Sequence, residues 1–79
     1  MMINALLNTK VEIIRDGTKV LEVKANIQEK EIYFGNVDIR ELDIVRVSSI
    51  RIQYQIITIY TQLQRNCVLY KKATYRKVG

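Results

Sequence analysis

The sequence predicts an all-β protein, either a small antiparallel barrel or a bent sandwich of five to six strands with one short helical turn. Twelve Ile and eight Val supply β-branched side chains, which favour strands. Apolar and polar residues alternate in several short runs, as they do in half-buried strands. Turn signals recur at short intervals and no proline is present. Because no linker or repeat divides the 79 residues, we expect a single domain over 1–79.

The first element is a β-hairpin centred on Asp16-Gly17, which joins residues 10–15 to residues 18–25. A type I′ turn needs positive φ at both central positions, and Asp-Gly satisfies that need. Apolar residues alternate with charged ones on both flanks. The pattern therefore predicts two strands, each with one face toward the core.

A third strand is expected over 31–34, where it ends at the turn pair Gly35-Asn36. The apolar spacing over 37–42 then predicts a single helical or 3₁₀ turn laid over one end of the sheet. Asp38 is suited to be its N-cap, with Glu41 three residues later, as in a capping box.

The β-rich run from 44 to 64 is expected to form strands near 44–48 and 51–63, separated at Ser48-Ser49. The apolar phase reverses at Ile56-Ile57, which predicts a β-bulge there. Arg65-Asn66 is the next turn, and a last strand follows over about 67–75. Residues 2–7 fit a short helix or a strand equally well.

Charge divides the chain into two unequal halves. Residues 44–79 carry seven cations and no acid, whereas residues 1–43 carry six cations and eight acids. Such a cationic half attracts phosphates, acidic proteins or anionic membrane surfaces. No apolar run reaches the length of a membrane span, so a membrane partner is not expected.

The main candidate site is the basic, tyrosine-bearing C-terminal half. Tyrosine beside Lys or Arg on a β face suits a protein interface, and it also suits single-stranded nucleic acid, whose bases stack on the rings. A purely structural role is the third interpretation, in which lysines protect sheet edges and tyrosines fill core margins. The candidate binding residues are Arg46, Arg51, Tyr54, Tyr70, Lys71, Lys72, Tyr75, Arg76 and Lys77.

Catalysis and cofactors are not expected. The chain lacks histidine and a glycine-rich phosphate loop, and its basic half has no carboxylate. The chain therefore lacks side chains that general acid–base and metal mechanisms commonly use. The acidic cluster of Asp38, Glu41 and Asp43 fits helix capping better than calcium binding. Cys67, the only cysteine, is expected to be a small core residue at the start of a strand.

Three stretches resemble small β-barrel proteins of Gram-positive phages and mobile elements. They are residues 14–17, residues 25–28, and residues 38–46 followed by 54–57, so the resemblance covers about residues 10–57. Leu42 stands where that pattern has Gly, and Ser48-Ser49 replaces its Asn-Gly turn. The resemblance implies a virion accessory protein, an assembly part or a binder of a host factor, and it transfers no functional residue.

We therefore expect a non-enzymatic interaction or assembly module without cofactors. It would engage an acidic protein through the basic C-terminal face, with nucleic-acid or nucleotide binding by the same face as the alternative. The abundant β-branched surface favours a homo-oligomer. One cysteine and no export signal favour a cytoplasmic location, meaning the host cytoplasm or a virion for a phage protein.

Overall fold

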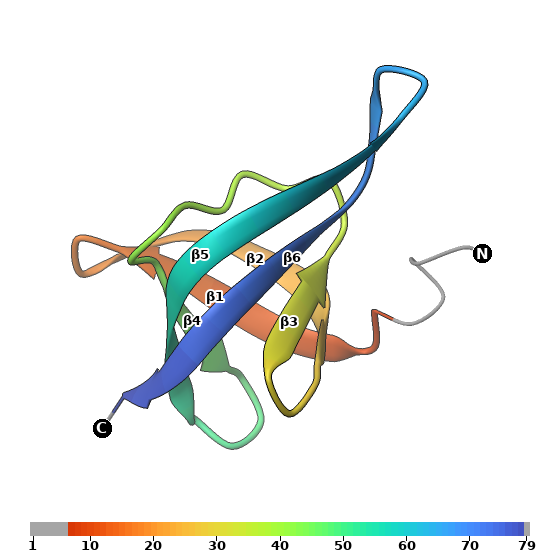
Figure 1. Cartoon of the computed structure of the whole chain (residues 1–79). Helices are drawn as coiled ribbons and strands as arrows, with labels where there is room; N and C mark the ends of the chain where they lie inside the picture. Colours follow the sequence, from red (N-terminus) through yellow and green to blue (C-terminus); the bar gives the residue numbers. More distant parts are fainter. Residues whose placement is uncertain (1–6, 79) are drawn as a thin grey trace.

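The computed structural model describes residues 7–78 and shows six antiparallel strands closed into a barrel (Figure 1). Around the barrel the order is β1-β2-β3-β6-β5-β4, and β4 pairs with β1 to close the ring. The described part of the chain contains no helix, and hence none that is long and apolar enough to cross a membrane. The predicted all-β class is confirmed, and of the two expected architectures, a barrel or a bent sandwich, the structure is the barrel. The strands are β1 (Thr9–Arg15), β2 (Thr18–Ile27), β3 (Glu31–Phe34), β4 (Ile44–Val47), β5 (Gln53–Gln64) and β6 (Cys67–Val78).

The barrel interior is filled by apolar side chains from all six strands and from the loop before β4. In β1, Val11 and Ile13 are fully buried while Glu12 points outward, as the alternating pattern predicted. Small barrels of this kind enclose a packed core and no channel. The buried apolar residues are Val11, Ile13, Ala25, Ile32, Phe34, Ile39, Val45, Val47, Ile56 and Ala73.

Backbone dihedrals confirm two predicted turns. Asp16 and Gly17 have φ values of 53° and 79°, which fit the expected turn between β1 and β2. Arg65 and Asn66 have φ values of 52° and 67° at the tip of the β5–β6 hairpin. Short, tight connections at these points determine which strands are neighbours, because hairpin strands must pair with each other.

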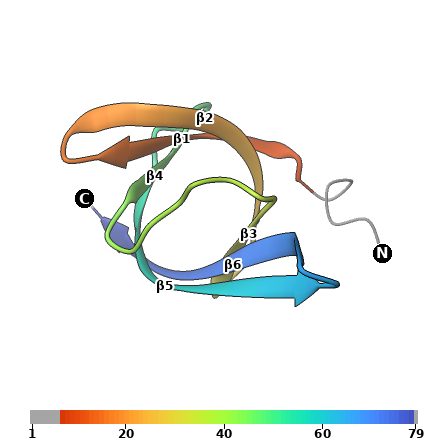
Figure 2. The same cartoon turned by 90° about the horizontal axis from the view of Figure 1, so that it is seen from above.

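The segment between β3 and β4 differs from its prediction. Residues 35–43 form an irregular loop instead of a helical turn, and Figure 2 shows this loop crossing one end of the barrel. The loop ends in a turn in which the Asp43 N–H donates to the Arg40 carbonyl at 3.2 Å. Ile39 is 5% exposed, so the loop closes the core at that end. Its predicted position over the end of the sheet is correct, but its conformation is not helical.

The predicted bulge in β5 is present, because the register of β5 against β6 shifts between Ile56 and Thr58. Beyond it, β5 and β6 run past the barrel as a hairpin (Figure 1). β3 pairs with β6 only through residues 71–74. We call residues 61–70 the projecting hairpin. It contributes to the elongated dimensions of 38 × 22 × 21 Å.

Cys67 is a further correction, since it lies exposed at the base of the projecting hairpin's turn instead of in the core. The sequence pattern could not reveal that β6 begins outside the barrel. Most of the N-terminal segment, for which helix and strand were both expected, lies outside the described residues.

Candidate functional site

The outer surface of β3, β6 and β5 brings three tyrosines together around one lysine. Lys72 lies opposite Tyr33 of β3 on one side and opposite Tyr60 of β5 on the other. Its ammonium nitrogen is 5.3 Å from the Tyr60 ring centroid. The Tyr33 and Tyr70 rings are in contact, with centroids 5.8 Å apart. We call Tyr33, Tyr60, Tyr70 and Lys72 the tyrosine face.

The charge of the tyrosine face is largely balanced. Lys72 Nζ lies 3.2 Å from Glu31 Oε2, and this hydrogen bond is the main reason why the pKa of Lys72 is raised. Glu31 also accepts a hydrogen bond from the Tyr33 hydroxyl at 3.4 Å. Lys72 is therefore protonated and already paired with a carboxylate. The face offers aromatic rings, of which Tyr60 is 55% exposed, more than free positive charge.

Free positive charge lies instead at one end of the barrel. Arg51 and Lys77 line a hollow of about 330 Å³ between the turn after β4 and the end of β6. Arg76 donates two hydrogen bonds to Gln55 Oε1, at 3.0 and 2.7 Å, which leaves its charge uncompensated. None of these three cations forms an ion pair with a carboxylate of residues 7–78. We call Arg51, Arg76 and Lys77 the basic end.

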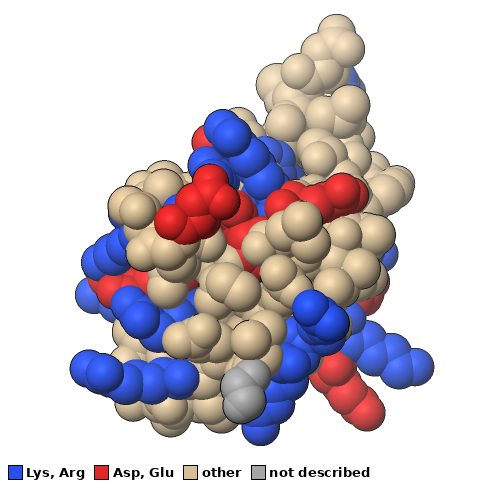
Figure 3. Space-filling view, turned by 90° about the vertical axis from the view of Figure 1, so that its left-hand side faces the viewer, with Lys and Arg blue, Asp and Glu red and all other residues tan. Residues whose placement is uncertain are grey.

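The surface view agrees with this distribution. Figure 3 shows Lys and Arg side chains over the lower part of the barrel and also at its left and top, whereas the projecting hairpin at the upper right is almost free of charge. On β6, Tyr70, Lys72 and Arg76 share the outward face because side chains alternate along a strand. Arg76 of the basic end therefore lies on the same side of β6 as the tyrosine face, whereas Lys77 lies on the opposite side of β6 and Arg51 lies in the segment after β4.

Three of the sequence-predicted residues are engaged inside the protein. The Tyr75 hydroxyl donates to the carbonyl oxygens of Gln28 at 2.6 Å and Glu29 at 3.0 Å, which fastens the turn between β2 and β3. Burial is the main cause of the raised pKa of Tyr75. Its ring packs edge-on against Tyr54 with centroids 4.7 Å apart, and both rings border the core. Substituting Tyr75 would therefore disturb the fold as well as any interface.

Lys71 is the third such residue. Its ammonium group donates to the Val37 carbonyl at 2.6 Å and ties β6 to the loop across the barrel end. Lys71 lies on the opposite side of β6 from Lys72, so the two neighbouring lysines do not form one patch.

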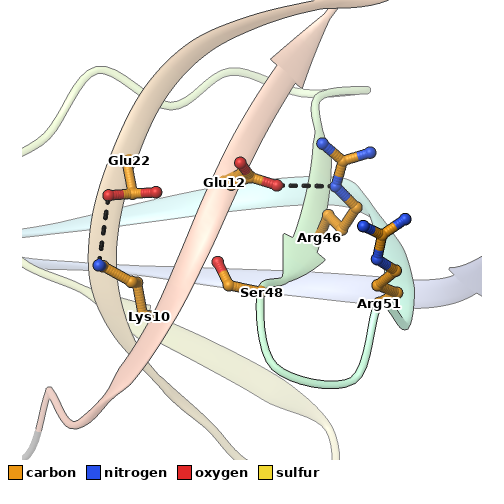
Figure 4. A pocket seen from close by; sticks show the side chains of 6 residues that line it. All are labelled: Lys10, Glu12, Glu22, Arg46, Ser48 and Arg51. Atoms are coloured by element: carbon orange, nitrogen blue, oxygen red, sulfur yellow. Dashed lines mark hydrogen bonds and ion pairs between the residues drawn. The ribbon is translucent and has the colours of Figure 1, made fainter.

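Arg46, the last of the predicted residues, lies in a polar hollow of about 340 Å³ on the outer surface of β2, β1 and β4 (Figure 4). Its Nε donates to Glu12 Oε1 at 2.8 Å, and Lys19 Nζ lies 3.1 Å from Glu12 Oε2. The hydrogen bond from Lys19, followed by that from Arg46, lowers the pKa of Glu12. Figure 4 shows the Arg46 and Arg51 guanidinium groups at one edge of the hollow, so Arg46 adjoins the basic end.

The hollow does not place a base within hydrogen-bond distance of its one hydroxyl. Ser48 is the one hydroxyl that lines it, and Ser48 Oγ is buried without a hydrogen-bond partner among residues 7–78. A serine nucleophile needs a base within hydrogen-bond distance. The described part of the chain also contains no group of three or more His, Cys, Asp or Glu residues that could hold a metal ion.

Two members of the tyrosine face were missed by the sequence prediction. Tyr33 alternates with Ile32 and Phe34, which are both buried, so its outward direction was readable from the pattern. What the pattern did not contain was the pairing of β3 with β6, which places Tyr33 beside Lys72. The alternation of side chains along β5 likewise indicated that Tyr60 points outward, but its position relative to Lys72 depends on the bulge in β5.

The fold and site thus define a small closed antiparallel β-barrel with a tyrosine face, a basic end and a projecting hairpin. Comparison of the chain with protein-family models, with curated proteins and with solved structures finds no match.

Proposed function

We propose that this barrel is a non-enzymatic protein-interaction or assembly module that binds an acidic protein surface through the basic end and the tyrosine face. The observation that carries the proposal is that three cations near one end of the barrel, Arg51, Arg76 and Lys77, form no ion pair with a carboxylate of residues 7–78. Unpaired cations steer acidic partners during encounter. Exposed tyrosines supply the desolvated contacts that carry most interface energy.

The paired state of Lys72 favours a protein partner over single-stranded nucleic acid. Nucleic-acid platforms place free cations beside the rings on which bases stack. Here the cation among the rings is paired with Glu31 at 3.2 Å, while Arg76 and Lys77 lie farther along β6 and Arg51 lies after β4. A protein surface can use the rings and the distant cations separately. The resemblance to barrels of phages and mobile elements makes a virion or host-directed role part of this proposal.

The test uses fluorescence anisotropy with two labelled probes, a Glu-rich peptide containing Leu and an oligothymidylate of similar length. We expect the wild-type chain to bind the peptide, with affinity falling as salt rises. The Arg76→Glu/Lys77→Glu variant should weaken binding at least tenfold. The matched control is Lys24→Glu/Lys30→Glu, which makes the same change in net charge at exposed positions of other elements and should bind nearly as wild type.

A second variant tests the tyrosine face. Tyr60→Ala/Tyr70→Ala should weaken peptide binding about tenfold while the thermal unfolding midpoint stays close to wild type. Tyr75 is avoided because its hydroxyl holds the turn between β2 and β3. Tighter binding of the oligothymidylate than of the peptide, with loss in the tyrosine variant, would overturn the proposal in favour of nucleic acid. Failure of the chain to bind either probe would also overturn it.

A further inference from the structure

The outer edge of β5 is open over much of its length. β4 pairs with β5 only through residues 53–55. At Ile56 the loop over residues 35–43 replaces β4 as the hydrogen-bond partner of β5. The Leu42 N–H donates to the Ile56 carbonyl at 2.8 Å, and the Ile56 N–H donates to the Asp43 carbonyl at 2.9 Å. From residue 57 to residue 64, no strand of the described chain pairs with this edge. We call residues 57–64 the free β5 edge.

An open edge exposes unpaired backbone N–H and C=O groups, and proteins usually protect it with charge, proline or distortion. The free β5 edge, Ile-Thr-Ile-Tyr-Thr-Gln-Leu-Gln, has neither a charged residue nor a proline. Register shifts occur between Ile56 and Thr58 and between Gln62 and Leu63, so the strand is regular from Thr58 to Gln62. From Thr58 to Gln62 the edge is therefore regular and has no charge or proline, which suits it to strand pairing.

The side chains around the edge are also unusually apolar for a surface. Ile57 is 41% exposed, Tyr60 55%, Leu63 58% and Leu69 40%. Arg65 is the single charged residue before Lys71 on the projecting hairpin. An isolated two-stranded ribbon is marginally stable in water, and added strands stabilise it. A partner that supplies both a strand and apolar contacts would therefore stabilise the projecting hairpin.

Charge indicates what that partner is. An acidic protein gains nothing from an uncharged edge, so this edge does not suit the partner proposed for the basic end. A second copy of the chain does suit it. In a two-fold antiparallel pairing the same strand lies on both sides, so like charges on it are brought close to those of the copy, and a charge at the two-fold axis faces its own equivalent. The free β5 edge has none. The edge also lies where β5 leaves the barrel, so the two barrels remain apart (Figure 1).

We infer that two copies of this chain associate by antiparallel pairing of their free β5 edges, forming a four-stranded sheet in the order β6-β5-β5-β6. This inference rests on the proposed function as an interaction and assembly module, but it uses the backbone edge of β5, which shares only Tyr60 with the tyrosine face. Each barrel keeps its basic end accessible, and the dimer presents two such ends to an acidic partner. Two linked sites bind one extended partner more tightly than a single site does.

The test is the mass of the full chain in solution, measured by sedimentation equilibrium over a range of concentrations with a reductant present. We expect a reversible dimer for the wild type and a monomer throughout for Thr61→Lys/Leu63→Lys, because two lysines on each edge repel their copies. The matched control is Val20→Lys/Ile50→Lys, which adds the same charge at exposed positions of β2 and of the turn after β4. This control should remain dimeric.

Hydrogen exchange locates the contact independently of any variant. Raising the wild-type concentration should slow amide exchange within residues 57–64. A monomer at every concentration, protection gained elsewhere instead, or a dimer found only without reductant and joined through Cys67 would each overturn the inference. The failure of one proposal can be told from the failure of the other. Arg76→Glu/Lys77→Glu should no longer bind the acidic peptide but should remain dimeric. Thr61→Lys/Leu63→Lys should be monomeric but should still bind the peptide.

Discussion

Arg15 holds Asp43 through two parallel hydrogen bonds, from Nε to Oδ1 at 2.9 Å and from Nη2 to Oδ2 at 2.7 Å. Asp43 is 3% exposed, and its Oδ2 also accepts the backbone N–H of Arg40 at 2.9 Å. The hydrogen bond to Asp43 is the main cause of the raised pKa of Arg15. This pair joins the end of β1 to the last residue of the loop before β4, at the point where the barrel closes.

Removing the Asp43 carboxylate should destabilise the barrel. We expect Asp43→Ala to lower the free energy of unfolding by about 2–3 kcal/mol, because the Arg40 N–H and the guanidinium of Arg15 lose their acceptor. Urea unfolding followed by circular dichroism measures the change. Asp38→Ala is the control, since its side chain is 61% exposed in its pair with Arg15. Equal losses in the two variants would contradict this role of Asp43.

Stability should fall in acid partly through Glu12. Its pKa is lowered in the folded state from an ordinary value of 4.5, mainly by the hydrogen bond from Lys19 and then by that from Arg46. A carboxylate with a lowered folded pKa contributes stability that is complete above its unfolded pKa. That contribution is lost as the pH falls below about 4.5 through the lowered value.

Unfolding midpoints in urea, measured from neutral to strongly acid pH, test this expectation. Glu12→Gln should have a shallower decline below pH 4.5 than the wild type, because the titrating group is absent. Glu41→Gln, which removes an exposed carboxylate, should follow the wild-type curve. Identical curves for Glu12→Gln and the wild type would show that Glu12 does not contribute to acid unfolding.

Two adjacent isoleucines should respond differently to truncation. Ile13 is fully buried, whereas Ile14 is only partly buried on the other face of β1. We expect Ile13→Ala to lower the free energy of unfolding by about 3 kcal/mol, because it removes buried methyl groups and leaves a cavity. Ile14→Ala should cost clearly less. Thermal unfolding of the two variants tests the register of β1, and a reversed order would show that the strand faces the other way.

Gly17 should tolerate Asn better than Ala. A Cβ at this position meets nothing within 4 Å, so space does not limit substitution. The φ of 79° limits substitution instead, because L-residues other than Asn and Asp are strained at this φ. Gly17→Ala should therefore lower the unfolding free energy by about 1 kcal/mol. Gly17→Asn should lower it by less in the same denaturation experiment, and equal losses would show that backbone strain is not the cause.

Local features of the fold were readable from the sequence wherever they depend on neighbouring residues. The Asp16-Gly17 turn, the alternation of Val11 and Ile13 with Glu12, and the bulge after Ile56 all follow from short-range sterics and side-chain periodicity. The prediction that failed depends on contacts between residues that are distant in sequence. The loop over 35–43 is held by Arg15 and Lys71, which are distant in sequence, and these contacts replace the predicted helical turn.

The same distinction between local and long-range contacts applies to the candidate site. The sequence determined that β6 would carry Tyr70, Lys72 and Arg76 outward, because a strand alternates its side chains. It also determined the uncharged, unguarded composition of residues 57–64. Only the tertiary structure decided that Lys72 meets Glu31, that Tyr75 fastens the turn after β2, and that β5 continues beyond its neighbour β4. Those outcomes depend on the pairing of β6 with β3 and on barrel closure. Non-local strand pairing depends on the whole core at once, and no short stretch of sequence contains it.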